Sequence, residues 1–185
     1  NNKSMPIYRI YTSGSTGTPK GVNQNHCTIV NLLFCYPSNN FQKVAMLTTF
    51  CFDVSVQEMF APLIFGFELC ISKSNIKNNI NELVEWIKNS QITCILMIPS
   101  LWNIVIEYCL KRKLELFDHL NYAHLAGEPC ILNHNNEKSI IIYNDYGPTE
   151  SHVCTFKKVQ FGCKYPSIGK PISNTFCYVV YFGSL

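Results

Sequence analysis

The chain has 185 residues, of which 47% are hydrophobic and 15% are charged, and its formal net charge is +3. A chain of this length fits one domain with a buried core, and its apolar content excludes an intrinsically disordered protein. The scattered basic residues argue against nucleic-acid binding, and no apolar run approaches the ~18–20 residues that a membrane-spanning helix needs.

Ten cysteines are many for this length, but no two of them form a Cys-x-x-Cys pair. Several lie inside apolar periodic runs, where a reduced thiol acts as a small hydrophobic side chain: Cys27, Cys35, Cys70, Cys94 and Cys109. The first ten residues show no signal-peptide pattern. We therefore expect reduced cysteines, no zinc site, no membrane partner and a cytoplasmic location.

The first predicted strand covers residues 7–11 and leads into a loop rich in glycine and hydroxyl side chains. The loop reads YTSGSTGTPKGV over residues 11–22, and a helical pattern begins after Asn23. Glycines let backbone N–H groups approach an anion closely, and the hydroxyls and Lys20 add donors and charge. A strand, such a loop and then a helix favour polyphosphate binding, although an ordinary polar surface loop is the alternative. The loop is not the P-loop of NTPases, which has Gly before the lysine and Ser or Thr after it.

Strand-like and helix-like patterns then alternate along the chain. Predicted strands cover residues 44–49, 68–72, 92–98, 122–126 and 140–143, and predicted helices cover residues 55–65, 80–88 and 101–110. The run 92–98 is continuously apolar, which is typical of a buried parallel strand. Repeated strand–helix units predict an α/β fold with a mainly parallel sheet flanked by helices, in one domain.

Three polar segments each follow a predicted strand: Asp53, residues 126–128 and residues 144–150. Ligands of parallel sheets bind beyond the carboxyl ends of the strands. The three segments are therefore expected to converge on one cleft.

The segment around Asp53 carries a helix-start signal. Ser55 and Glu58 have the spacing of a capping box for the predicted helix 55–65. If Ser55 caps this helix, Asp53 lies one step outside it and its carboxylate is uncommitted. The alternative is that Asp53 itself caps the helix.

The sequence YGPTE at residues 146–150 combines a tight turn with hard oxygen ligands. Gly147 and Pro148 make the turn, and Thr149 and Glu150 are expected to open a short helix. Carboxylate oxygens suit Mg²⁺, which makes Glu150 the candidate metal ligand. An ordinary acidic residue at a helix start is the alternative interpretation of Glu150.

Four stretches, taken in order, resemble the adenylate-forming superfamily of acyl- and aryl-CoA ligases, luciferases and the adenylation domains of nonribosomal peptide synthetases. They are YTSGSTGTPKGV at 11–22, FDVSVQEMF at 52–60, LAGEPC at 125–130 and NDYGPTES at 144–151. The closing segment 167–180 looks like the one that follows in adenylation domains, to which the resemblance is strongest. The resemblance spans nearly the whole chain. It implies part of the large N-terminal α/β domain, with some antiparallel strands near the C-terminus.

This resemblance implies ATP-dependent activation of a carboxylate. The substrate carboxylate attacks the α-phosphate of ATP, which gives an acyl-adenylate and pyrophosphate, and such reactions depend on positioning and charge neutralisation. The implied catalytic residues are Lys20, Thr149 and Glu150, with Glu150 holding Mg²⁺. The implied ATP-binding residues are Thr12, Ser13, Gly14, Ser15, Thr16, Gly17, Lys20, Gly127, Glu128, Asn144, Asp145, Tyr146, Gly147 and Thr149.

The resemblance also implies an amino-acid substrate. In peptide-synthetase adenylation domains the residue that matches Asp53 pairs with the α-ammonium group, which needs an opposite charge when it leaves water. The implied substrate pocket consists of Asp53, Gln57, Leu96, His124, Ala126, Asp145, Val153 and Cys154. Gln57, His124 and Asp145 would make this pocket polar and favour a polar or cationic amino acid over an aromatic one. His124 as a hydrogen-bonded core residue and Asp145 turned toward the nucleotide are the alternatives.

No stretch resembles the earlier part of the family's large domain or its lysine-bearing C-terminal subdomain. Residues 1–185 are therefore expected to be a partial adenylation core that is inactive alone. In the parent enzyme the acyl group would pass to the phosphopantetheine thiol of a carrier protein, in cis or in trans. An acyl- or aryl-CoA ligase with the same chemistry, and a non-catalytic nucleotide-binding fragment, are the alternatives.

Overall fold

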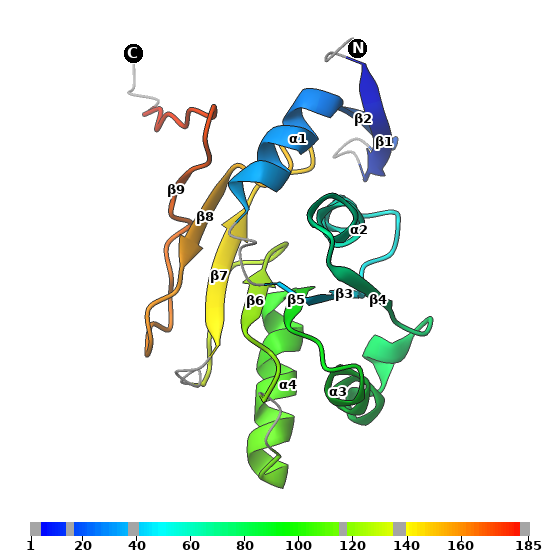
Figure 1. The fold of residues 1–185 in the computed structure, drawn as a ribbon. Helices are drawn as coiled ribbons and strands as arrows, with labels where there is room; N and C mark the ends of the chain where they lie inside the picture. Colours follow the sequence, from blue (N-terminus) through cyan, green and yellow to red (C-terminus); the bar gives the residue numbers. More distant parts are fainter. Residues whose placement is uncertain (1–4, 14–16, 37–40, 115–117, 135–139, 182–185) are drawn as a thin grey trace.

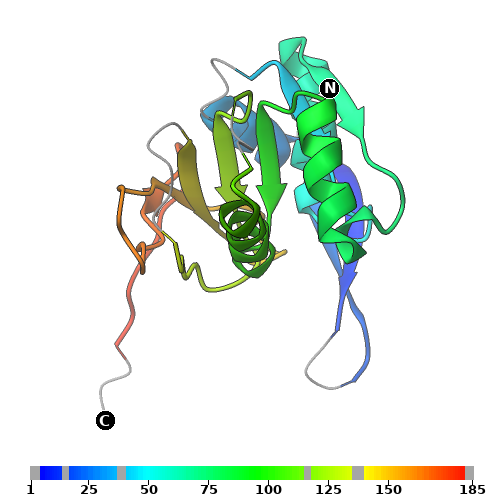
Figure 2. The same cartoon turned by 90° about the horizontal axis from the view of Figure 1, so that it is seen from below.

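The computed structural model describes residues 5–13, 17–36, 41–114, 118–134 and 140–181. A large mixed sheet has helices on both faces, and a two-stranded hairpin stands apart from it (Figure 1). Seen at right angles, the hairpin extends away from the large sheet (Figure 2).

The large sheet has the strand order β4-β3-β5-β6-β7-β8-β9. The neighbours from β4 to β7 pair parallel, and β8 and β9 add antiparallel strands at one edge. This confirms the predicted mainly parallel sheet with antiparallel strands near the C-terminus. The strands are β3 (Lys43–Met46), β4 (Glu68–Ile71), β5 (Cys94–Met97), β6 (Tyr122–Leu125), β7 (Ile141–Tyr146), β8 (Thr155–Lys158) and β9 (Lys170–Pro171).

Helices cover both faces of this sheet. α1 (His26–Cys35) and α2 (Val54–Phe65) pack on one face, and α3 (Ile80–Asn89), preceded by the 3₁₀ turn η1 (Ile76–Asn78), and α4 (Pro99–Arg112) pack on the other. Local side-chain and backbone preferences determine where two of these helices start or end. The Asn79 side chain caps the start of α3, and Gly66 ends α2 in the left-handed region at φ 76°. No helix in the described ranges is long and apolar enough to span a bilayer.

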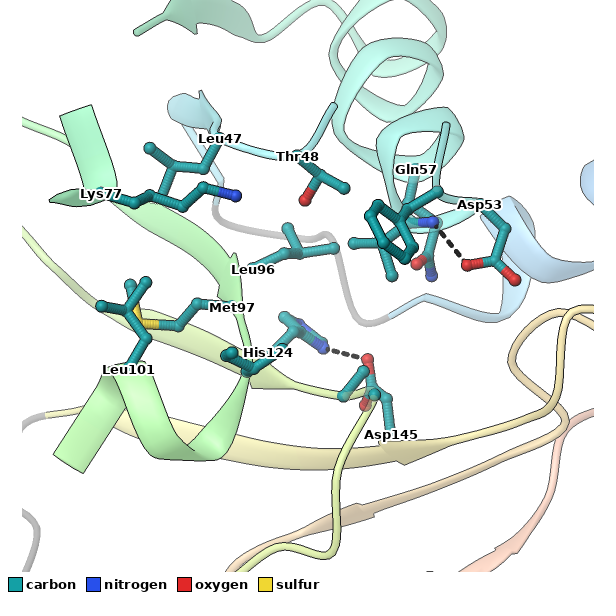
Figure 3. Close-up of a pocket in the computed structure, with 15 residues that line it drawn as sticks. Leu47, Thr48, Asp53, Gln57, Lys77, Leu96, Met97, Leu101, His124 and Asp145 are labelled. Atoms are coloured by element: carbon teal, nitrogen blue, oxygen red, sulfur yellow. Dashed lines mark hydrogen bonds and ion pairs between the residues drawn. The ribbon is translucent and has the colours of Figure 1, made fainter. Parts of the chain in front are cut away.

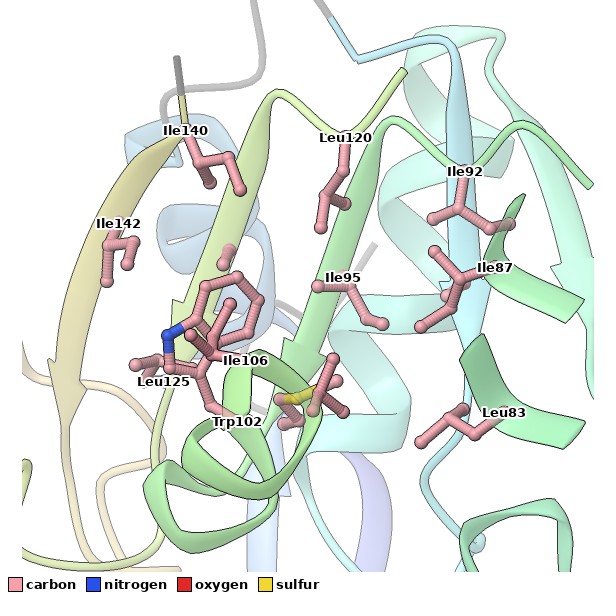
Figure 4. Close-up of a cluster of buried hydrophobic side chains, with 14 of the residues drawn as sticks. Leu83, Ile87, Ile92, Ile95, Trp102, Ile106, Leu120, Leu125, Ile140 and Ile142 are labelled. Carbon is pink, nitrogen blue, oxygen red and sulfur yellow. The ribbon is translucent and has the colours of Figure 1, made fainter. Parts of the chain in front are cut away.

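The core follows the two-residue period of the strands. In β5, Ile95 and Met97 join the cluster under α3 and α4, while Cys94 and Leu96 join the cluster beside α1. Figure 4 shows the α3–α4 side, where Trp102 lies among isoleucine and leucine side chains and is only 1% exposed. Burial on both faces explains why all four residues of β5 are apolar.

The hairpin changes the expected setting of the glycine-rich loop. β1 (Pro6–Thr12) pairs antiparallel with β2 (Lys20–Asn25), and Thr12 lies opposite Lys20. The described residues Thr12 and Lys20 therefore lie opposite each other in a hairpin, and β2 separates Lys20 from α1. The helix predicted after Asn23 is present as α1, which begins at His26. The strand β2 before it was not predicted, and its pairing with β1 holds the polar segment KGVNQN extended.

Candidate functional site

The sheet carries a cavity of about 300 Å³, here called the inner cavity, beyond the carboxyl ends of its parallel strands. Figure 3 shows side chains from α2, β5, β6 and β7 facing it. Two of the eight predicted substrate-pocket residues do not line it. Val153 packs in the same core cluster as Leu96, and the Cys154 thiol donates a hydrogen bond to the Tyr146 carbonyl. The other six do: Asp53, Gln57, Leu96, His124, Ala126 and Asp145.

A second cavity of about 610 Å³, here called the outer cavity, adjoins the inner one. Gly127 and Asp145 line both cavities. The wall of the outer cavity also includes Tyr165 and Ile168, from the segment between β8 and β9. Six predicted ATP-binding residues line the outer cavity: Gly127, Glu128, Asn144, Asp145, Tyr146 and Gly147. The three polar segments thus converge as predicted.

Asp53 occupies the N-cap position of α2. Its Oδ1 accepts a hydrogen bond from the Val54 amide at 2.9 Å, while the Ser55 hydroxyl donates to the Phe52 carbonyl. The predicted capping box of Ser55 and Glu58 is therefore wrong. The helix begins one residue earlier, and the Glu58 carboxylate turns toward the end of β3 instead.

Asp53 nevertheless keeps a second carboxylate oxygen outside the helix cap, and its side chain lines the inner cavity. The buried Tyr8 hydroxyl interacts electrostatically with this carboxylate and has no hydrogen-bond partner among the described residues. Burial, with a further contribution from Asp53, raises the pKa of Tyr8. The Tyr8 hydroxyl therefore stays protonated beside the acid.

His152, which the sequence analysis missed, ties the YGPTE segment to the start of α2. The Val153 amide donates to its Nδ1 at 2.9 Å, so the proton is on Nε2, which donates to the Asp53 carbonyl at 3.0 Å. Burial lowers the pKa of His152 and favours this neutral form. No local pattern marks such a residue, because its partner lies far away in the chain.

The segment after β7 is a turn, so the predicted short helix at Thr149 and Glu150 is wrong. The Ser151 amide donates to the Pro148 carbonyl and the Cys154 amide donates to the Tyr146 carbonyl, each at 2.9 Å. These bonds reverse the chain into the antiparallel strand β8, which leaves no room for a helix. A Cβ atom at Gly147 would overlap the His152 carbonyl oxygen, so the turn requires glycine.

Gln24 connects this turn to the hairpin. Its buried amide nitrogen donates to the carbonyls of Thr149 at 2.9 Å and Glu150 at 2.7 Å. Lys20 lies four residues earlier on the same strand, which is ~13 Å along an extended chain. Within the described ranges, Lys20 and Glu150 are exposed and line neither cavity. The structure thus joins their backbone segments without placing both side chains in one cavity.

The remaining predicted phosphate-binding residues lie on the hairpin. Thr12 ends β1, and Ser13 and Gly17 are exposed on the loop between the strands. The residues Gly14, Ser15 and Thr16 lie outside the described residues.

Two predicted ATP-binding side chains also hold the walls of the outer cavity. The Asn144 amide donates to the carbonyls of Pro166 and Ser167 at 3.3 and 3.0 Å. The Glu128 carboxylate accepts two hydrogen bonds of 3.1 Å from Ser100, in the first turn of α4. Both side chains therefore shape the outer cavity. The Tyr146 side chain, which also lines this cavity, is 49% exposed.

His124 and Asp145 form a buried pair at the base of the inner cavity. The His124 Nδ1 atom lies 2.9 Å from Asp145 Oδ2, and the Tyr36 hydroxyl donates to the same oxygen at 2.7 Å. His124 is thus a hydrogen-bonded residue that also lines the cavity. Tyr36, at the end of α1, was not predicted, because it lies in an apolar stretch with no motif around it.

Comparisons with known proteins identify the family of the chain. Residues 1–181 match the family model described as AMP-binding enzyme. The chain is 33% identical to tyrocidine synthase 2 of Brevibacillus parabrevis, over 94% of this chain and 5% of that protein. It is also 33% identical to gramicidin S synthase 2 of Brevibacillus brevis, over 94% of this chain and 4% of that protein. The chain thus spans a small part of the length of these relatives.

Two solved structures share the fold. The nonribosomal peptide synthetase FmoA3, bound to α-methyl-L-serine-AMP, superposes with a TM-score of 0.82 at 22% identity, over 93% of this chain and 20% of that one. A four-domain nonribosomal peptide synthetase, holo-AB3403 bound to AMP and glycine, superposes with a TM-score of 0.74 at 23% identity, over 90% of this chain and 13% of that one.

Proposed function

Because the chain belongs to the AMP-binding enzyme family, we propose that it is the core of an adenylation domain that activates an amino acid for a nonribosomal peptide synthetase. The observation that carries this proposal is the pair of adjoining cavities, with Asp53 in the inner one and the ends of β6 and β7 between the two. The domain would be part of a longer enzyme, whose other parts include the lysine-bearing subdomain and the carrier protein with its phosphopantetheine thiol.

The inner cavity suits an amino acid. Asp53 offers a carboxylate oxygen beyond its helix cap, and an α-ammonium group that leaves water needs such a partner. The walls around it include the apolar side chains Leu96 and Met97. Asp53 therefore supports an amino acid over a plain carboxylic acid.

The outer cavity suits the nucleotide of ATP. Its walls combine the Tyr146 ring with backbone and proline surface from Gly127, Gly147 and Pro148, which can accept a flat base. The border with the inner cavity, at Gly127 and Asp145, would then bring the substrate carboxylate to the α-phosphate. The new C–O–P linkage forms there as the bond between the α- and β-phosphates breaks and pyrophosphate leaves.

The hairpin and the YGPTE turn supply the charged groups for this step. Lys20 and the loop hydroxyls would hold the β- and γ-phosphates, and Thr149 would donate its hydroxyl to a phosphate or to the substrate carboxylate. Glu150 is exposed and lies two residues after Pro148, which lines the outer cavity. Its carboxylate would supply one oxygen ligand of a Mg²⁺ ion that arrives with ATP. Bound Mg²⁺ supplies charge neutralisation at the phosphates.

Asp53→Asn tests the proposal, because asparagine caps a helix about as well as aspartate but carries no charge. In the full-length protein that contains these residues, we expect kcat/KM for the preferred amino acid in ATP–pyrophosphate exchange to fall about 100-fold. The KM for ATP should change little.

Asp118→Asn, at an exposed acid outside both cavities, is the matched control and should leave exchange unchanged. Full amino-acid activation by Asp53→Asn, or exchange driven by a plain carboxylic acid better than by any amino acid, would contradict the proposal.

A further inference from the structure

Three residues that line the inner cavity each carry a buried polar atom with no hydrogen-bond partner among the described residues: Gln57 Nε2, His124 Nε2 and Asp145 Oδ1. Their side chains are 2%, 1% and 4% exposed, and all three line the cavity. Leaving a buried donor or acceptor unpaired is costly, so native structures rarely do so without a reason. Three such atoms around one cavity point to a ligand that pairs them.

Tyr36 determines which atoms remain for that ligand. Its hydroxyl and His124 Nδ1 both contact Asp145 Oδ2, at 2.7 and 2.9 Å, which leaves Oδ1 free for the cavity. Burial, and then the Asp145 carboxylate, raise the pKa of Tyr36, so its hydroxyl remains a donor. With Nδ1–H donating to Asp145, Nε2 is the His124 ring nitrogen that remains for the cavity.

Aromatic stacking holds His124 in this orientation. The Tyr36 ring lies 4.3 Å from the His124 ring at an interplanar angle of 25°, and the Tyr143 ring lies 4.9 Å from it at 8°. The imidazole is thus stacked on two tyrosine rings while its edge meets Asp145 (Figure 3). A recognition group fixed in this way can discriminate between side chains by hydrogen bonding.

The cavity therefore offers an acceptor, Asp145 Oδ1, a donor, Gln57 Nε2, and the unpaired ring nitrogen His124 Nε2. A carboxamide has two N–H donors and one carbonyl acceptor, which complements all three atoms. An ammonium group lacks the acceptor and would share the cavity with the Lys77 ammonium, while a carboxylate would meet Asp145 without a donor. An aliphatic or aromatic side chain would leave all three atoms unpaired.

We propose that the inner cavity selects an amino acid whose side chain ends in a carboxamide, and that Tyr36 is the positioning residue that orients Asp145 and His124 for this selection. The proposal rests on the proposed function. It adds a substrate class to the proposed function, and a role for Tyr36, which does not line the inner cavity.

An exchange panel on the full-length protein tests the substrate class. It compares asparagine and glutamine with the similarly sized leucine and methionine, and with lysine, glutamate and phenylalanine. We expect kcat/KM for asparagine or glutamine to exceed that for leucine and methionine at least ~100-fold, because a site built to hydrogen-bond rejects analogues that cannot. A highest kcat/KM for any of the other five would overturn the carboxamide class but not the proposed function. Exchange with no amino acid would overturn both.

Tyr36→Phe tests the positioning role, because it removes the hydroxyl and keeps the stacked ring. We expect the ratio of kcat/KM for the carboxamide amino acid to that for its apolar analogue to fall about 10-fold, mainly through KM for the amino acid. Tyr108→Phe removes a hydroxyl that bonds Asn81 outside the cavity and should preserve the ratio. An unchanged ratio in Tyr36→Phe would overturn the assignment, whatever happens to thermal stability.

Gln57→Leu provides a second variant that is expected to fold, since the Gln57 amide nitrogen has no partner to lose among the described residues. The variant should move the preference about 10-fold toward leucine and methionine without lowering the thermal unfolding midpoint. A preference equal to that of the native protein would contradict the role of Gln57 in the proposal.

Discussion

Glu58 shows how a single buried side chain holds a wall of the inner cavity. Its Oε2 accepts from the amides of Leu47 at 3.2 Å and Thr48 at 2.8 Å, and its Oε1 accepts from the Thr48 hydroxyl at 3.0 Å. Burial raises the pKa of Glu58 to about 7, although these hydrogen bonds lower it. A carboxyl whose pKa is higher in the folded state contributes stability below the unfolded value of 4.5, and this contribution is lost as the pH rises through 7.

Glu58→Gln should therefore change the pH dependence of stability. The amide can accept from the two backbone N–H groups and donate to Thr48, but it has no charge to desolvate. Relative to the variant, we expect the native protein to lose ~2–3 kcal/mol of stability between pH 5 and pH 8.

Unfolding monitored at both pH values measures this difference, and Glu85→Gln, at an exposed position of α3, is the control that should show none. If the difference in the free energy of unfolding between the native and Glu58→Gln proteins were the same at pH 5 and pH 8, it would be inconsistent with a buried titrating carboxyl.

At the scale of elements, the hairpin β1–β2 and the turn after β7 act together through Gln24. The buried amide of Gln24 donates to two consecutive carbonyls of the turn, and Lys20 lies at the start of the same strand. These two hydrogen bonds would set the position of the proposed phosphate-binding loop relative to Glu150. The proposed triphosphate site is thus assembled from two elements that are distant in the chain.

Gln24→Leu should weaken this link, because leucine fills a similar volume but cannot donate. We expect KM for ATP to rise about 10-fold in exchange assays while KM for the amino acid stays within about two-fold, since the two lost hydrogen bonds lie away from the inner cavity. Gln160→Leu, at an exposed glutamine, is the control. Parallel increases in both KM values would indicate a general loss of structure instead.

At the scale of the whole molecule, the two cavities lie at the carboxyl edge of one sheet, where further parts of an enzyme could close over them. Tyrocidine synthase 2 and gramicidin S synthase 2 are many times longer than this chain, which covers 5% and 4% of them. Adenylation chemistry depends on charge neutralisation as pyrophosphate leaves, and the resemblance assigns part of it to a lysine of a subdomain that residues 1–185 do not resemble.

Residues 1–185 alone should therefore support less than ~1% of the exchange rate of the full-length protein at equal concentration, because one stabilising charge is worth ~10²–10³ in rate. Exchange assays on both proteins, with circular dichroism to show that the fragment is folded, measure this. A folded fragment with a rate near that of the full-length protein would contradict the proposed domain organisation.

The fold was largely predictable because its signals are local. The apolar run around Ile95 and the helical spacing of Leu83, Val84 and Ile87 reflect burial of one strand and one helix face. The errors arose where distant contacts override local propensity. β2 is a strand because β1 pairs with it, and α2 starts at Val54 because Glu58 turns to the end of β3 rather than back to the cap.

The amino-acid sequence by itself determined the family, the alternation of strands and helices, and the segments that meet at the cavities, because motifs and periodicity are properties of neighbouring residues. Only the tertiary structure decided that Tyr36 meets Asp145 across 109 residues and that Gln24 meets Glu150 across 126. Such contacts depend on strand order and on the packing of α1 and the hairpin against the sheet. The polar atoms left for a ligand could be identified only after these partners were placed.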